Sequence, residues 1–339
     1  MSTKSKPDIF YIHLLRAIAA TAVIAIHVLG PFREMYQQIP FDAWYSAVAI
    51  NSLSRWAVPI FIMITGALLI RPDQPLNLSR FFSKRLLKVV VPFVAWSLIY
   101  IGITGIQAGP EAARTALIES PTEPVWYHLW FFYDFIPLYL VVLLLTPVIA
   151  KLNERQLLIL IAAWLTLTLA HLLKIPTPLR QATILYSGYL VLGCYLFQQK
   201  DRKQLWMWVG LGVAAVCVNL VGSWWAAEAK GAYSSKYMGY KTLNTVLIAA
   251  MLFVLAQHYG GKIHGRLKAL IISLSKYSLG IYLLHPILLI PIRSRLETAP
   301  FTFGHPAFAI PMLTFVILLL AWACTALLAR IPVARKLVP

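Results

Sequence analysis

Apolar runs of about 18 to 25 residues recur along nearly the whole chain, and each can cross a hydrocarbon core of about 30 Å as an α-helix. The chain of 339 residues is 60% hydrophobic and only 12% charged, so it has too little polar surface to cover a soluble globule. The sequence therefore predicts an all-α polytopic membrane protein with about ten transmembrane helices. We expect these spans at residues 10–30, 46–70, 86–106, 126–150, 156–173, 181–197, 205–222, 242–258, 270–291 and 306–330.

The distribution of lysine and arginine between the runs predicts how the chain is oriented. With the N-terminus in the cytoplasm, the inside segments hold eighteen of the thirty Lys and Arg residues, and the outside segments hold nine. Positive residues accumulate in cytoplasmic loops, so both termini are expected to be cytoplasmic. No soluble domain of useful size fits between the runs, and we expect a single integral-membrane domain over residues 1–339. No nucleic acid is expected as a partner, because the formal charge of +18 follows from this topology and no basic stripe is interleaved with aromatics.

The first apolar run carries an arginine and a histidine, Arg16 and His27. An ionisable group near the middle of a bilayer costs roughly 2.5 to 3.5 kcal/mol on insertion scales, so it needs a partner, a water-filled cavity or a function. Eleven residues correspond to about three helical turns plus 20°, and to about 16 Å along the axis, so both side chains face one groove. Taken singly, Arg16 could reach the inner headgroups and His27 could be an interface histidine. Taken together on one face, they favour a functional site.

A basic segment precedes the third run, with Arg80, Lys84, Arg85 and Lys88. Arg85 and Lys88 stand three residues apart and share a helical face, which is a geometry suited to binding an anion. A bare cluster of this kind beside a membrane is more often a signal of topology. The sequence leaves both interpretations open.

Four further residues stand out in apolar surroundings: Arg55, His128, Trp130 and His285. Arg55 could act in a site or bond to helix carbonyls. The aromatic residues around His128 and Trp130 are typical of a membrane-interface belt, which does not explain the histidine. His285 precedes a proline that frees a carbonyl, although a lone histidine there usually serves packing. No metal site is expected, because no two His, Asp or Glu residues within the apolar runs stand at the i, i+4 spacing of a helical zinc site.

The chain resembles the integral-membrane acyltransferase-3 family over essentially its whole length. The resemblance rests on four motifs in the family's order, namely Leu15-Arg16-Ala17-Ile18-Ala19 followed by His27; Ser54-Arg55-Trp56-Ala57-Val58-Pro59-Ile60-Phe61-Ile62-Met63-Ile64-Thr65-Gly66; Tyr127-His128-Leu129-Trp130-Phe131-Phe132; and Ser278-Leu279-Gly280-Ile281-Tyr282 with His285. The most similar members are short stand-alone enzymes that O-acetylate surface polysaccharide, such as the one acting on enterobacterial common antigen.

The resemblance implies a multi-pass enzyme of the bacterial cytoplasmic membrane, surrounded by lipid. It would move an acyl group, expected to be acetyl although succinyl stays open, from cytoplasmic acyl-CoA to a sugar hydroxyl of a surface or lipid-linked polysaccharide. Acyl-CoA would be a co-substrate, and no tightly bound cofactor is expected. His27 would be the catalytic base, with an acyl-histidine intermediate as a variant, and Arg16 would line the donor channel.

The remaining candidates divide between the two substrates. Arg85, Lys88, Lys84 and Arg80 would hold the phosphates of the donor. Arg55, His128, Trp130 and His285 would contact the acceptor or the oxyanion. Buried cations and aromatic platforms would also suit a transporter or flippase for a lipid-linked saccharide, which is the alternative function.

Two positions depart from the family's pattern. The family often has an aspartate three residues before the first arginine, where this chain has His13. The family's Arg-x-x-Arg appears here as Arg85 followed by Lys88. The lysine keeps the positive charge but cannot form the two parallel hydrogen bonds of a guanidinium.

Overall fold

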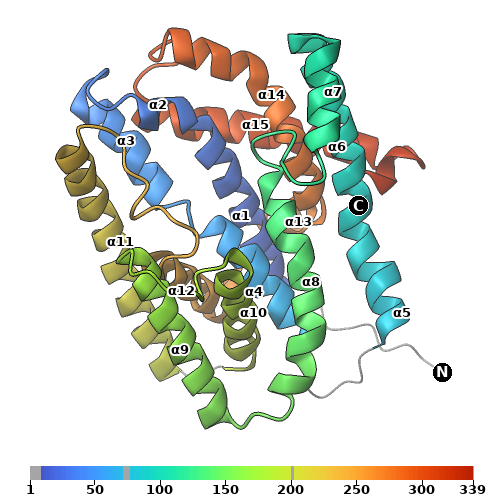
Figure 1. Cartoon of the computed structure of the whole chain (residues 1–339), viewed down its shortest axis with the longest axis vertical. Helices are drawn as coiled ribbons and strands as arrows, with labels where there is room; N and C mark the ends of the chain where they lie inside the picture. The colour runs from blue at the N-terminus through green and yellow to red at the C-terminus, as the bar shows by residue number, and fades with distance from the viewer. Residues whose placement is uncertain (1–8, 72–76, 200–201, 339) are drawn as a thin grey trace.

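The computed structural model describes residues 9–71, 77–199 and 202–338, and within these ranges it contains helices and connections but no strand (Figure 1). Nine helical stretches of the described part are long and apolar enough to cross a membrane. Helix α10 (Ala182–Gln198) is equally apolar but has only 17 residues. Counting α10 gives the expected ten spans, and the all-α polytopic membrane class is confirmed.

The other helices are α1 (Phe10–Val28), α2 (Gly30–Glu34), α3 (Phe41–Ser52), α4 (Ala57–Leu69), α5 (Leu78–Phe81), a π-helical segment (Phe82–Leu86), α6 (Leu87–Ala108), α7 (Pro110–Glu119), α8 (Trp130–Ile149), α9 (Glu154–Leu172), α11 (Arg202–Lys230), α12 (Leu243–Tyr259), α13 (Gly265–Lys276), α14 (Ser278–Thr298) and α15 (Pro306–Leu328). Short 3₁₀ turns follow α12 and α15, at Gly260–Lys262 and Ala334–Lys336.

Helix α1 runs through the middle of the bundle (Figure 1). It packs against α4, α12, α13, α14 and α15, and its apolar residues Leu15, Ala19 and Ile24 have no exposed surface. A helix surrounded in this way presents its polar side chains to other protein segments instead of to lipid. Arg16 and His27 are therefore placed inside the bundle, where an ionisable side chain has functional uses.

Helices α4 and α10 make the closest contact between two spans. A Cβ atom added to Gly66 would come within 2.0 Å of the Leu190 carbonyl oxygen, and one added to Gly193 would come within 2.1 Å of the Met63 carbonyl oxygen. Small residues allow membrane helices to pack backbone to backbone in this manner. The C-terminal half of the second predicted span is thus fixed against α10.

The second predicted span, 46–70, is interrupted between α3 and α4 at residues 53–56. Pro59 lacks an N–H group and its ring crowds the carbonyl four residues earlier, which belongs to Arg55, so a continuous helix is unfavourable there. The Ser54 hydroxyl donates to the Ile50 carbonyl at 2.7 Å and the Trp56 indole donates to the Leu53 carbonyl at 2.6 Å, so side chains satisfy part of the freed backbone. Arg55 is consequently part of a helix break and not of a regular span.

Two further predicted spans differ from the structure at their ends. Span 126–150 becomes helical only at Trp130, so His128 lies in the preceding turn. Span 270–291 is divided at Tyr277 into the short helix α13 and the membrane helix α14. The sequence of α13 is too polar and too short to cross a bilayer, and hydrophobic windows merged it with the next run.

Candidate functional site

Three histidines from distant parts of the sequence meet at one place in the bundle. His27 lies near the end of α1, His285 lies in the first half of α14, and His128 lies in the turn before α8. The His27 and His285 rings lie edge to edge in nearly one plane, with centroids 4.9 Å apart and an interplanar angle of 4°, and the His128 and His285 ring centroids are 5.7 Å apart. His128 and His285 have no exposed surface, whereas the residue His27 is partly exposed. His27 is therefore the histidine that a substrate can reach.

The hydrogen bonds of this cluster define which nitrogen carries the hydrogen in the neutral rings of His27 and His285. His285 Nδ1 is 3.1 Å from the Ile281 carbonyl oxygen, which can only accept, so this nitrogen carries a hydrogen. In neutral His285 the other nitrogen, Nε2, then accepts, and it lies 2.6 Å from His27 Nδ1. His27 must donate from Nδ1, which leaves the lone pair on its Nε2 free. The geometry presents His27 as a base whose tautomer is fixed by His285.

His128 is enclosed by tyrosines. Its ring lies 5.0 Å from Tyr100 and 5.3 Å from Tyr282, and the Tyr282 hydroxyl donates to the His128 backbone carbonyl. The Tyr100 hydroxyl donates to the Leu283 carbonyl at 2.7 Å, which ties α6 to α14. Within the described residues neither imidazole nitrogen of His128 makes a hydrogen bond of ordinary geometry. A buried polar ring of this kind retains donor and acceptor capacity for a ligand.

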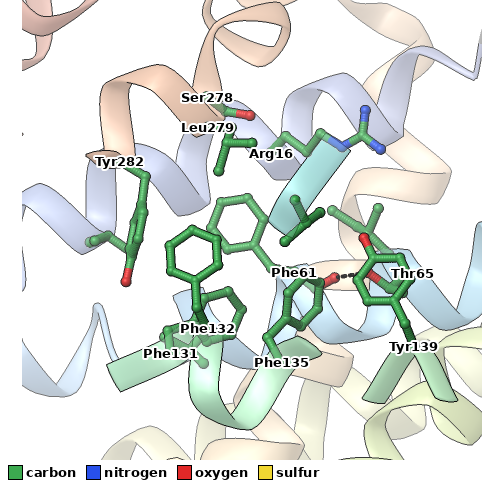
Figure 2. A pocket seen from close by; sticks show the side chains of 14 residues that line it. Arg16, Phe61, Thr65, Phe131, Phe132, Phe135, Tyr139, Ser278, Leu279 and Tyr282 are labelled. Atoms are coloured by element: carbon green, nitrogen blue, oxygen red, sulfur yellow. Dashed lines mark hydrogen bonds between the residues drawn. The ribbon is translucent and has the colours of Figure 1, made fainter. Parts of the chain in front are cut away.

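A cavity of about 170 Å³ lies between α1, α4, α6, α8 and α14 and reaches the histidine cluster at Tyr282. Figure 2 shows aromatic side chains of α8 facing Leu279 and Tyr282 of α14, with Arg16 of α1 alongside. Tyr282 lines this cavity, and its ring is also 5.9 Å from His285. The cavity is mostly apolar and aromatic, with the Arg16 guanidinium as its one charged group, so it suits a thin and largely uncharged chain.

Arg16 makes no hydrogen bond or ion pair with the described residues, although it is partly buried. Arg16 and Arg85 both lie close enough to the Tyr139 ring to interact with it electrostatically, and they also act on each other. Arg85 belongs to the π-helical segment, an irregularity that is common at functional sites. Arg85 is itself exposed and does not line the cavity, so its link to the cavity is electrostatic, through Arg16 and Tyr139.

The other basic candidates are not brought to the cavity. Lys84 and Lys88 have exposed side chains, and neither lines it. Arg80 lies in α5, and its side chain is outside the described part of the chain. Of the four predicted donor-binding residues, Arg85 is the one with a structural link to the cavity.

Arg55 lies at the break between α3 and α4, next to two tyrosines. Its guanidinium is 4.9 Å from the centre of the Tyr240 ring, and it also interacts with Tyr233. Tyr240 stacks in turn on Trp130 at 5.4 Å and 25°. The Arg55 Nε atom is fully buried and has no hydrogen-bond partner in the described part of the structure. Arg55 and Trp130, chosen separately from the sequence, therefore share one aromatic partner.

The sequence analysis missed Tyr127 and Arg293 as members of this site. Tyr127 is 38% exposed, its ring lies 5.0 Å from His27, and Arg293 lies 5.1 Å above it. In the sequence Tyr127 is one of the aromatic residues typical of a membrane-interface belt, and Arg293 is one of the nine positive residues expected outside. His13, which stands where the family often has aspartate, is 2.9 Å from the Ser275 hydroxyl, so it connects α1 to α13.

A family model described as an acyltransferase domain matches residues 9–327. No curated protein and no solved structure matches the chain significantly. Among the described residues, no group of three or more His, Cys, Asp or Glu is arranged to hold a metal ion, the histidine cluster included.

Proposed function

The chain belongs to the acyltransferase-3 family, a match covering residues 9–327, and from this premise we propose that it transfers an acyl group from acyl-CoA to a sugar hydroxyl. Acetyl is the proposed acyl group, and a surface or lipid-linked polysaccharide is the proposed acceptor, as in the polysaccharide O-acetyltransferases that the sequence resembles. The proposed location is the bacterial cytoplasmic membrane with both termini inside. The observation that carries the proposal is the orientation of His27 by His285 beside an apolar cavity.

The chemistry needs one base. The acceptor hydroxyl gives its proton to His27 Nε2 while its oxygen bonds to the thioester carbonyl carbon. The carbon–sulfur bond then breaks, and the CoA sulfur leaves as a thiolate that takes the proton from His27. His285 keeps its own Nδ1 hydrogen throughout and holds the imidazole in the required tautomer, as the hydrogen bonds at 3.1 Å and 2.6 Å support.

The donor would enter from the side of Arg16 and Arg85. Two guanidinium groups that form no ion pair with a carboxylate of the described residues suit the phosphates of CoA, which they can bind through bidentate hydrogen bonds. The cavity of about 170 Å³ would hold the thin arm that ends in the thioester, and Tyr282 would bring that end to the histidine cluster. Lys84, Lys88 and Arg80 would add a general attraction for the anionic donor.

The test is a His27→Asn variant. The asparagine amide can still donate to His285 from the position of Nδ1, but it has no basic nitrogen at the position of Nε2. Loss of a general base costs typically 10²- to 10⁴-fold in rate, so CoA release in the presence of glycan should fall by at least about 100-fold. The glycan of cells that carry this variant should lack the acyl group by mass spectrometry.

His258→Asn is the matched control, because His258 bonds to its own helix at Val254 and is remote from the site. It should keep normal activity at the same membrane abundance. Activity of His27→Asn equal to that of His258→Asn would remove His27 from catalysis. The family match does not favour the alternative of a transporter, and a transporter would leave acyl-CoA intact in the same assay.

A further inference from the structure

We propose that the acceptor of this transfer is an anion, and that Arg55 binds its carboxylate or phosphate group while the neighbouring aromatic rings hold its sugar. The inference rests on the proposed function in taking the ligand to be the acceptor. It adds the chemical class of that acceptor, which neither the family nor the cavity specifies.

The first observation is the lack of a counter-charge for Arg55. The groups that act on Arg55 in the described structure are the tyrosines Tyr240 and Tyr233, and no Asp or Glu is among them. Asp134, the acidic residue of the adjacent α8, interacts with Lys241 instead. A largely buried guanidinium without an acidic partner is costly, and its Nε makes no hydrogen bond, so the contacts with Tyr240 and Tyr233 leave part of its hydrogen-bonding capacity unused. An anionic ligand would supply both the missing negative charge and an acceptor for the Nε hydrogen.

The second observation is the shape of the surroundings. Arg55, Tyr240 and Trp130 form a row, with the guanidinium 4.9 Å from the Tyr240 ring and that ring 5.4 Å from Trp130. Aromatic faces give apolar contact to the C–H face of a sugar ring, and a guanidinium binds carboxylate or phosphate with two parallel hydrogen bonds. The row thus combines the two contacts that a charged saccharide requires.

The third observation is an electrostatic link to the proposed base. The charges of Arg55 and Arg293 both act on His27, so an anion held by Arg55 would lie within electrostatic reach of the His27 ring. Arg293 is paired with Glu297 at 3.1 Å and is half exposed, so it is less available to a ligand. A hydroxyl on a sugar anchored at Arg55 would therefore reach His27 from the side of Tyr127, where the cluster is open.

The segment over Arg55 is a connection and not a helix. Tyr233 and Tyr240 both belong to residues 231–242, between α11 and α12, and Tyr233 is attached by the Asn51 amide at 3.1 Å. Connections rearrange at a lower free-energy cost than packed helices. A local displacement at Tyr233 would admit the acceptor, while Tyr240 stays in the row because its backbone carbonyl accepts a hydrogen bond from the Tyr189 hydroxyl at 2.7 Å.

The experiment measures binding to the purified full chain in detergent without acyl-CoA, so the result does not depend on turnover. Three short-chain glycosides serve as probes: hexyl β-glucoside as the neutral one, hexyl β-glucuronide for a sugar carboxylate, and glucose linked to a short alkyl phosphate for a carrier phosphate. At least one anionic probe should bind at least tenfold more tightly than the neutral one, and the preferred probe identifies the source of the charge. Arg55→Gln should remove this preference, and Arg55→Lys should retain part of it.

Arg180→Gln is the control, because it removes an exposed positive charge that has no described contact with Arg55, Tyr240 or Trp130 and should keep the preference. Equal binding of all three probes by the unmodified protein would overturn the proposal, and this comparison requires no variant to fold. A preference that survives in Arg55→Gln would also overturn it. Steady-state kinetics distinguish acceptor binding from stabilisation of the oxyanion. If Arg55 acted on the oxyanion, Arg55→Gln would lower kcat for the neutral and anionic probes alike, and that result would contradict acceptor binding.

Failure of this inference and failure of the proposed function give different results. Transfer of an acyl group to the neutral probe as efficiently as to the anionic probes would support the function and refute the inference. Binding of an anionic probe through Arg55 with no transfer would refute the function and support the inference.

Discussion

Replacing His285 separates its role as a hydrogen-bond acceptor from its role in packing. His285→Leu fills much of the same space but cannot accept the hydrogen of His27 Nδ1, which is now 2.6 Å from His285 Nε2. The His27 Nδ1–H group would then have no hydrogen-bond partner, next to a position that has no exposed surface. His285→Gln can place its carbonyl oxygen near the former position of Nε2 and restore the acceptor.

The expected size of the effect follows from that hydrogen bond. Leaving a buried donor unsatisfied costs about 1–3 kcal/mol. If this cost falls on the reactive orientation of His27, the rate falls by roughly 5- to 160-fold, since each 1.36 kcal/mol is tenfold. We expect His285→Leu to lower kcat by about 10- to 100-fold and His285→Gln to stay within about fivefold of the unmodified enzyme.

The assay is the initial rate of CoA release at saturating acyl-CoA and acceptor, with acyl-CoA affinity measured separately to confirm an unchanged donor site. The thermal stability of both variants in detergent serves as the control for folding. Equal rates for His285→Leu and His285→Gln would refute the assignment of the tautomer, because packing alone would then explain His285.

Two further predictions concern packing and donor binding. Gly66→Ala should lower the free energy of unfolding by about 1–3 kcal/mol, because its Cβ would lie 2.0 Å from the Leu190 carbonyl oxygen. The Cβ of Gly102→Ala meets no atom within 4 Å, so this control should be neutral or stabilising in thermal unfolding. Arg85→Gln should weaken acyl-CoA binding by about 5- to 20-fold, the loss of a charge-assisted hydrogen bond, while Lys84→Gln should change it less than twofold. Equal unfolding of the two glycine variants, or equal binding by the two basic-residue variants, would contradict these assignments.

The membrane class was predictable because the hydrophobic effect acts on each run separately, and run length is visible in the sequence. The arrangement of Arg16 and His27 on one helix was predictable for the same local reason. Arg16 lines the cavity, whereas His27 belongs to the histidine cluster farther along α1. The catalytic roles of both residues stay predictions.

The partner of His27 was not predictable in this way. His285 is 258 positions away, and its contact with His27 depends on how α1 and α14 pack. Helical periodicity gives the face of a residue but not the element that covers that face. His285 was therefore grouped with acceptor or oxyanion candidates, whereas the structure links it directly to the proposed base.

The helix break at Arg55 could have been found from the sequence. Pro59 removes the hydrogen bond to the Arg55 carbonyl, and a proline within a long apolar run is a known signal for a kink. Hydropathy averages over such a run and conceals the break. The tyrosines that contact Arg55, at positions 233 and 240, are in a connection whose course the sequence does not determine.

The position of Tyr282 between the cavity and the histidine cluster has a consequence for the membrane potential. A protein that handles a cytoplasmic donor and an external acceptor at one site could leak protons or ions and so dissipate the membrane potential. Tyr282 closes the aromatic cavity at the histidine cluster and is fastened by its hydroxyl to the His128 carbonyl. A chain that fills the cavity can deliver its end group past this ring, while water finds few polar partners along the way. In the proposed function, an acyl group would pass this ring while a continuous file of water would not.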